Sequence, residues 1–313
     1  MRAMNLNFMG KRKVFYTISL LIMAIGIIFN MVFGTTLDIQ FSGGTIISYS
    51  YTGSLEEKAI ENVIEGAIGE QINTTKGVDS QTGRETITIT LVASKALPAP
   101  VQNSMLEAVQ KAFPDNDLQL RSTTSVDASV GKDFFAKGIA AVVLASLFMI
   151  LYVGIRFRKI GGLSAGCMAV VALLHDVLVA YFTFVIFRIP INDNFIAVVL
   201  TIFGYSLNAT IVIYDRIREN NNLYKGKLGY GELVNKSINQ TFARCLNTAL
   251  CTFVAVICIV VVALVFQLNS IISFALPMAF GIVSGCYSSI CLATTLWGTY
   301  KESRGKKASR RKI

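Results

Sequence analysis

Six long apolar stretches limit what this chain can fold into more than any other feature of its sequence. A helix that spans a lipid bilayer needs about 20 mainly apolar residues. The stretches that meet this requirement run over 14–33, 134–153, 163–187, 195–214, 245–266 and 271–300. Charged residues make up only 15% of the chain, against about 25% in a typical soluble domain. The sequence therefore predicts an α-helical integral membrane protein with six transmembrane helices.

Lys and Arg residues gather on one side of these six helices. Of the 29 basic residues, 20 fall in the N-terminal segment 1–13, the short loop after the second helix, the loop at 215–244 and the tail at 301–313. The loops on the opposite side hold only Arg188. Because cytoplasmic loops carry an excess of Lys and Arg, we predict a multi-pass protein of the cytoplasmic membrane with both termini in the cytoplasm. The net charge of +10 then reflects topology and some attraction to membrane lipid, and it indicates no nucleic acid as a partner.

The first apolar stretch is interpreted as a retained anchor. Its length of roughly 20 residues exceeds the 7–15 residues of a signal-peptide core, and no Ala-x-Ala site follows it before Thr35.

A polar block at 34–133 separates the first helix from the other five and is predicted to lie outside the cell membrane. It holds 7 basic and 13 acidic residues and no cysteine, so no disulfide framework supports it. β-branched and alternating segments predict strands at 45–51, 72–78, 85–92 and 118–126, with a turn at 79–83. Ser54 and Glu57 form a potential capping box for a first helix, and Pro100 opens a second. The order βαββαβ is typical of a ferredoxin-like α+β domain.

Few residues are suited to catalysis or to metal binding. His175 is the only histidine, and all six cysteines lie in or beside the apolar stretches. The sequence contains no nucleophile–base pair, metal-ligand spacing or phosphate loop, so we expect neither an enzyme nor a cofactor.

Polar residues inside the spans are the main functional candidates, because charge within a bilayer is expensive. His175 and Asp176 lie in the middle of the third span, and Asp176 is the only acidic residue placed near the membrane centre. The pair is either a proton relay or ion ligand, or a buried pair that fixes helix packing. In the fourth span, Gly204, Asn208 and Thr210 line either a wet path or a close helix–helix contact.

The loop after the fourth span begins with a charged cluster and ends with a segment in which apolar residues lie among polar ones. The cluster at 213–220 is interpreted as a membrane-edge anchor whose long side chains reach toward water, where Arg216, Arg218 and Glu219 are placed to touch a partner. Within the loop at 215–244, the segment that starts at Tyr230 and reaches Asn247 has the pattern of an interfacial amphipathic helix.

Two strings of residues match motifs of a known protein family. Leu37–Thr45 resembles an Asp-Phe-x-Gly-Gly-Thr signature through Asp38, Phe41, Gly43 and Gly44. The segment 204–220 is similar to a fourth-helix motif of the same family; its matching residues are Gly204, Tyr205, Ser206, Asn208, Asp215, Arg216, Arg218, Glu219 and Asn220. Both motifs resemble those of the SecF family of the bacterial protein-export machinery. Segments 174–176, 235–241 and 285–290 are also similar, so the resemblance extends from the first helix to the sixth. The sister SecD subunits differ in their fourth-helix motif and have a much larger external region.

The resemblance implies both an architecture and a function. Family members form half of a twelve-helix body of the RND superfamily, completed by a SecD subunit. The complex associates with the SecYEG channel and uses the proton-motive force to help draw unfolded preproteins outward. In this family the external domains move as membrane carboxylates gain and lose protons.

One position departs from the family pattern. The residue after the fourth-helix Asn is usually Asp, a candidate proton carrier, but here it is Ala209. Asp176 then takes this role, or the SecD partner supplies every titrating group, or the coupling is altered or lost. From the sequence alone we favour the second hypothesis. Two functions of other classes stay open, namely a self-contained RND-type exporter of lipids or small molecules and a structural scaffold subunit without proton coupling.

Overall fold

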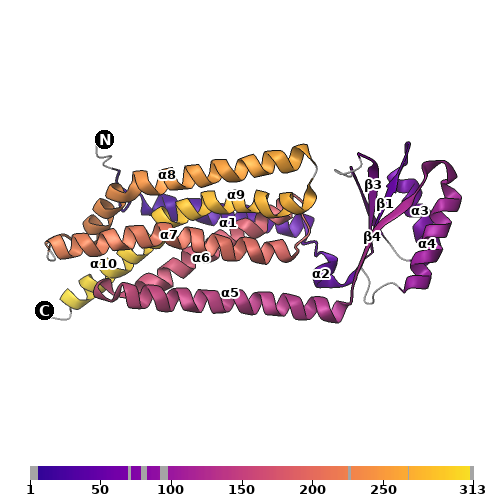
Figure 1. The fold of residues 1–313 in the computed structure, drawn as a ribbon. Coiled ribbons are helices and arrows are strands. Elements are labelled where there is room, and N and C mark those ends of the chain that lie inside the picture. Colours follow the sequence, from indigo (N-terminus) through magenta and orange to yellow (C-terminus); the bar gives the residue numbers. More distant parts are fainter. Residues whose placement is uncertain are drawn as a thin grey trace.

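The structure, a computed structural model, describes residues 6–69, 72–78, 83–91, 98–224, 227–266 and 268–310. A bundle of long helices forms one part of the molecule, and a small α/β domain is attached to one end of it (Figure 1). The predicted turn residues 79–82 and Val92 lie outside the described residues.

Six helical spans in the described part of the chain are long and apolar enough to cross a membrane. The helices of the bundle are α1 (Arg12–Phe33), α5 (Ala128–Arg156), α6 (Gly162–Ile186), α7 (Asp193–Tyr224), α8 (Tyr230–Val265) and α9 (Asn269–Tyr287), and α9 continues through a π-helical turn (Ser288–Ala293) into α10 (Thr294–Arg310). Short 3₁₀ turns occur at Pro114–Asn116 and Arg158–Ile160. The N- and C-terminal ends lie at the same end of the bundle, opposite the α/β domain (Figure 1).

Two helices, α7 and α8, extend further at the basic end of the bundle than the sequence predicted. α7 continues past residue 214 to Tyr224, and the segment expected to be an interfacial helix leading into the fifth span is the first part of the continuous helix α8. Two of its apolar residues, Leu233 and Ile238, are buried in the core of the bundle. No proline interrupts the segment, so the helix runs on into the fifth span.

The α/β domain has the predicted ferredoxin-like order. Its elements are β1 (Gly44–Tyr51), α3 (Glu57–Ile68), β2 (Asn73–Val78), β3 (Glu85–Leu91), α4 (Ala99–Ala112) and β4 (Gln119–Val126). The antiparallel sheet has the order β2-β3-β1-β4, with Ile47 opposite both Ile89 and Thr123. α3 and α4 cover the face of the sheet that points away from the bundle (Figure 1). Alternation along β3 buries Ile87, Ile89 and Leu91 against these helices, as the sequence predicted.

The predicted capping box at Ser54 and Glu57 is wrong. α3 begins at Glu57, its N-cap is Glu56, and no side chain caps it. The carbonyl oxygen of Ser54 accepts a hydrogen bond from Asn116 Nδ2 at 3.3 Å, which ties residue 54 to the turn before β4. Ser54 is therefore too early in the chain to cap the helix.

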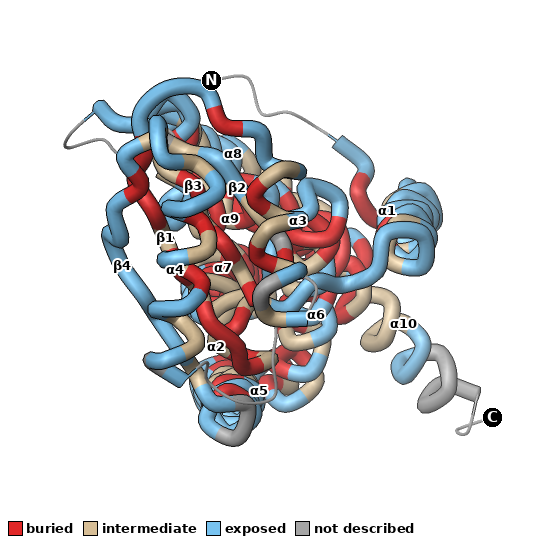
Figure 2. The backbone as a smooth tube through the Cα atoms, turned by 90° about the vertical axis from the view of Figure 1, so that its right-hand side faces the viewer, coloured by how far each residue is buried: buried red, intermediate tan, exposed pale blue. Residues whose placement is uncertain are grey.

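Burial differs sharply between the two parts. In the bundle, large apolar side chains such as Met31, Leu147 and Val265 are exposed, whereas many buried residues are small or polar. Buried backbone lies in the middle of the molecule along α7 and α9, and exposed backbone lies on the outer helices α1 and α5 (Figure 2). This pattern is that of a protein whose surface meets lipid.

Candidate functional site

A buried carboxylate in the middle of the bundle is the centre of the candidate site. Asp176 on α6 has no exposed surface. Its Oδ1 accepts a hydrogen bond from Ser284 Oγ at 2.6 Å. Its Oδ2 accepts one from Ser206 Oγ at 2.8 Å and one from Ser288 Oγ at 2.6 Å. The carboxylate therefore joins α6 to α7, to α9 and to the π-helical turn.

His175 completes the first layer around this carboxylate. Its Nδ1 lies 3.3 Å from Asp176 Oδ1 and 3.3 Å from Ser284 Oγ. Its Nε2 is buried and has no hydrogen-bond partner among the described residues. A buried ring nitrogen without a partner is uncommon in a folded protein.

A second polar layer extends from Asp176 toward the basic end of the bundle. Thr210 Oγ1 donates to Ser289 Oγ at 3.0 Å, and Ser289 Oγ donates to the carbonyl oxygen of Ser206 at 2.9 Å. Gly285 has no side chain at the contact with Ser206, where a Cβ would come within 3.0 Å of the serine Cβ. The close approach of α7 and α9 that this glycine permits sets the hydrogen-bond distances of the site.

The π-helical turn at 288–293 lies directly against the carboxylate. Such turns insert an extra residue into a helix and are frequent at functional sites. Here the turn begins at Ser288, which contacts Asp176, and also contains Ser289, which contacts Ser206. Two consecutive serines thereby bond to different parts of the same network, Ser288 to Asp176 and Ser289 to Ser206.

Chemically, the site is a buried carboxylate whose hydrogen-bond donors are serine hydroxyls. His175 is the only ion-pair partner that the described residues supply to Asp176, and the other donors are neutral hydroxyls. Within the described ranges, no group of three or more His, Cys, Asp or Glu residues is placed to bind a metal ion.

The polar residues of the fourth span divide between two faces of α7. Ser206 and Thr210 point into the network, whereas Gly204 and Asn208 are exposed on the outer face. Tyr205 packs against the cluster formed by α8 and α9, and Ala209 packs against the central core. Asn208 is therefore not brought together with Asp176.

The charged cluster after the fourth span links neighbouring helices at the basic end. Asp215 Oδ1 lies 2.6 Å from Arg218 Nη2 and 3.4 Å from Arg156 Nη2 on α5. Arg216 binds Glu219 at 2.6 Å and Gln240 on α8 at 2.7 Å. Asn220 is buried and donates to Ser237 Oγ at 2.9 Å. The contacts tie the end of α7 to α5 and α8.

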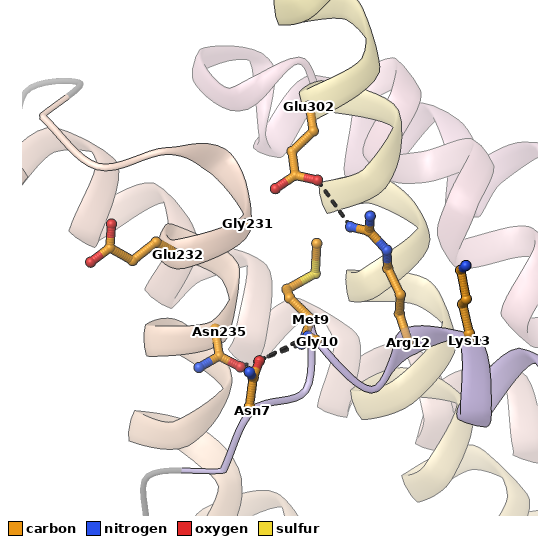
Figure 3. Close-up of a pocket in the computed structure, with 9 residues that line it drawn as sticks. All are labelled: Asn7, Met9, Gly10, Arg12, Lys13, Gly231, Glu232, Asn235 and Glu302. Carbon is orange, nitrogen blue, oxygen red and sulfur yellow. Dashed lines mark hydrogen bonds and ion pairs between the residues drawn. The ribbon is translucent and has the colours of Figure 1, made fainter.

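The N-terminal segment is fastened to the same end of the bundle. Asn235 Oδ1 on α8 accepts a hydrogen bond from the backbone N–H of Phe8 at 2.7 Å, and Arg12 pairs with Glu302 on α10 at 2.9 Å. Asn235, Arg12 and Glu302 line an open pocket of about 730 Å³. Figure 3 shows Arg12 reaching across to Glu302. The first and last spans are thereby joined.

The junction between the first helix and the α/β domain is built on a short helix, α2 (Ile39–Ser42). Asp38 caps it by accepting a hydrogen bond from the Gln40 backbone N–H at 3.2 Å. Burial raises the pKa of the Asp38 carboxyl above its usual value, the backbone hydrogen bonds oppose this, and the nearby Asp193 adds to it.

Phe41 and two glycines lock the junction in place. The Phe41 ring is buried and lies 5.3 Å from that of Phe135 and 5.9 Å from that of Phe134, both on α5. Gly43 and Gly44 have φ of 82° and 144°, and a Cβ on Gly44 would collide with the carbonyl oxygen of Leu91. Only glycine fits this backbone path from α2 into β1.

Comparisons with known proteins agree with this architecture. The family model described as "Protein export membrane protein SecD/SecF, C-terminal" matches residues 105–303. The protein translocase subunit SecF of Petrotoga mobilis is 31% identical over 298 residues, which are 93% of this chain and 95% of that protein. The chain belongs to the SecD/SecF family.

Longer members of the SecD/SecF family contain a region like this chain. The protein translocase subunit SecDF of Bacillus subtilis is 32% identical over 97% of this chain, which spans 39% of that protein. The crystal structure of SecDF from Thermus thermophilus superposes with a TM-score of 0.77 at 28% identity, over 95% of this chain and 39% of that one. The chain thus has the RND-type six-helix body with a ferredoxin-like domain at one end of the bundle.

Three serines of the site, Ser284, Ser288 and Ser289, were missed in the sequence analysis. Their spacing of four and five residues on an apolar helix was a usable signal, because residues four apart share a helix face. The resemblance of residues 285–290 to the family assigns Ser288 and Ser289 no role. The partner of that face, Asp176, was not evident from the spacing.

Proposed function

We propose that this chain is a SecF-type auxiliary subunit of the Sec protein-export machinery. It assembles with a SecD-like subunit and assists the late, proton-motive-force-dependent translocation of secreted proteins across the cytoplasmic membrane. The match over almost the whole length of SecF proteins, together with 39% of SecDF proteins, carries this proposal. SecDF proteins contain a region like this chain together with a further part, which supports a SecD-like subunit as the partner.

We also propose a channel with which the chain associates, a substrate that it helps to move, and its orientation in the membrane. The Thermus thermophilus SecDF is described as translocon-associated, which supports the SecYEG channel as a partner and unfolded preproteins as cargo. The excess of Lys and Arg at the end that holds both termini supports a cytoplasmic position for that end. The α/β domain then lies outside. The family consists of translocase subunits, and we assign no enzymatic activity to the chain.

Asp176 is the group that we propose to carry the moving charge in this half of the complex. The geometry favours Asp176 over a group of the partner subunit, because the carboxylate is fully buried and held by hydroxyls that can reorient. Moving one charge through 100 mV releases about 2.3 kcal/mol, enough to bias a conformational equilibrium of the external domain. Ala209 has no ionisable group and lies one turn after Ser206 on the same helix.

The decisive experiment removes the carboxyl group of Asp176 and introduces the family's usual Asp at position 209. Export of a secreted reporter is measured in cells whose own copy carries Asp176→Asn, Ala209→Asp or both, with Asp193→Asn as an exposed control. We expect Asp176→Asn to abolish the proton-motive-force-dependent part of export, Ala209→Asp to leave export intact, and the double variant to recover part of it. Unchanged export in Asp176→Asn would return the titrating role to the partner.

A pull-down from native membranes in mild detergent separates assembly from coupling. We expect the wild-type chain and the Asp176→Asn variant to retain a SecD-like subunit equally well. Recovery of the tagged chain alone as a homo-oligomer would contradict the export proposal and favour a self-contained transporter.

A further inference from the structure

A second cavity at the basic end of the bundle has a composition that the export function does not explain. It measures about 620 Å³ and lies where α5 ends, α6 begins and α10 passes both. Arg158, Lys301 and Arg304 line it together with Tyr300, and no acidic residue of the described chain does so. A cavity with three cations and no counter-charge attracts an anion.

The cations of this cavity are not paired with carboxylates of the described residues. Arg304 Nη1 donates to the hydroxyl of Tyr300 at 3.2 Å, and the Lys301 ammonium lies 5.7 Å from the centre of the Trp297 ring. Glu302, the nearest acid in sequence, is bound to Arg12 at 2.9 Å. The positive charge of the cavity is therefore available to a ligand.

Glycines create the space for these cations. Gly161 has φ of 89°, and a Cβ at this position would collide with the Lys301 ammonium. A Cβ on Gly162 would likewise collide with the carbonyl oxygen of Gly154. The turn between α5 and α6 thus leaves a recess in which the lysine reaches the cavity.

An apolar stripe leads from the cavity along α6. Leu163 lines the cavity and is 69% exposed, and Val171 and Leu174 continue the stripe at 49% and 50% exposure. Cys167 lies between them, lines the cavity and is exposed. Residues spaced by three or four share one helix face, so the cations stand at the head of a continuous surface suited to an acyl chain.

We infer that this cavity is a binding site for the head group of an anionic phospholipid, with its phosphate among Arg158, Lys301 and Arg304 and an acyl chain along the stripe on α6. Basic pockets between transmembrane helices on the cytoplasmic side are suited to such head groups. The inference goes beyond the proposed function and requires only that this end of the bundle meets the membrane surface.

Lipid titration of the purified full chain, followed by native mass spectrometry, tests the assignment. The probes are phosphatidylglycerol and, for comparison, phosphatidylcholine. The variant R158Q/K301Q/R304Q is set against K159Q/K227Q/R244Q, which removes the same charge from exposed positions outside the cavity. We expect phosphatidylglycerol binding to weaken about fivefold for each cation removed from the cavity, and the control to change less than twofold. Equal loss in both variants would overturn the assignment.

Thiol labelling of the wild-type protein tests the site without altering its charge. Cys167 in the cavity and Cys251 on α8 are both exposed, so the labelling rate at Cys251 is an internal control. We expect phosphatidylglycerol, but not phosphatidylcholine or millimolar inorganic phosphate, to slow maleimide modification of Cys167 at least threefold relative to Cys251. Equal rates in both lipids, or protection by phosphate alone, would refute the lipid assignment. Neither measurement reads export, so a negative result leaves the proposed function standing.

Discussion

The membrane body (the helical bundle) and the external domain (the α/β domain attached to one end of the bundle) place their polar and apolar residues in opposite ways. The external domain buries Ile60, Ile64 and Ile87 completely and leaves polar residues on its surface. The membrane body exposes Leu147 and buries Asp176 among serines. The contrast shows that the solvent outside each part decides which residues carry its stability: water drives apolar residues inward, whereas lipid gives apolar residues no reason to associate. Substitutions in the apolar core of the α/β domain and at the polar contacts of the bundle test this difference.

The largest expected effect breaks the apolar core of the external domain. Ile87→Ala removes a fully buried side chain from the sheet, and large-to-small changes of this kind cost about 2–5 kcal/mol. The matched change Leu147→Ala on the lipid-facing side of α5 should cost far less, because Leu147 is exposed on the bundle surface. Hydrogen exchange of the β1 and β3 amides in the full chain measures the first change, and thermal unfolding in detergent measures the second. Similar losses in both parts would contradict the contrast.

The next effect tests a polar contact inside the membrane body. Ser288→Ala removes one of the three hydroxyl donors to Asp176, and hydrogen bonds to charged groups contribute about 1.5–3 kcal/mol. We expect a lower unfolding temperature in detergent and reduced export. Ser303→Ala near the end of α10, where the serine bonds only to the backbone of its own helix in the described structure, serves as the control. Equal unfolding temperatures for both variants would show that the serine network adds nothing to stability.

The junction between the two parts should respond to pH. The pKa of Asp38 is raised, so the folded junction holds its proton above the pH at which the unfolded chain releases it. Stability from this group is full below the unfolded pKa of 3.8 and is lost as pH rises through the raised folded value. Asp38→Asn should keep the cap and remove this dependence, whereas Asp38→Ala should cost about 1 kcal/mol by losing the cap. Hydrogen exchange of residues 36–46 between pH 4 and 7 measures both, and an unchanged pH profile in Asp38→Asn would count against the assignment.

The smallest effect concerns the charged end of α7. Arg218 and Asp215 form a pair at 2.6 Å, but both side chains are partly exposed. Pairs of this kind contribute about 0.2–1 kcal/mol and are screened by salt. We expect Arg218→Gln to lower stability within this range at low salt and to have no measurable effect at 1 M salt. A loss that persists at high salt would show that the charged end is as tightly organised as the buried site.

Much of the fold could be predicted because its signals are local. Spans were visible from apolar length, and the strands of the external domain from alternation such as that around Ile87 and Ile89. Boundaries were harder to predict. The segment after Tyr230 has the pattern of an interfacial amphipathic helix, but tertiary contacts bury Leu233 and Ile238 in the core of the bundle.

Local signals in the sequence predict the six spans, the side on which basic residues lie, the βαββαβ order and Asp176 as an isolated acid in the third span. The packing of the helices determines which hydroxyls surround that acid, and why Ser206 and Thr210 join its hydrogen-bond network while Asn208 does not. The physical reason is that a periodic pattern fixes which residues share a helix face, but not how that helix is rotated against its neighbours. Here Gly285 permits the close contact of α9 with Ser206 on α7, and the π-helical turn after Tyr287 holds the serines that bond to Asp176 and Ser206.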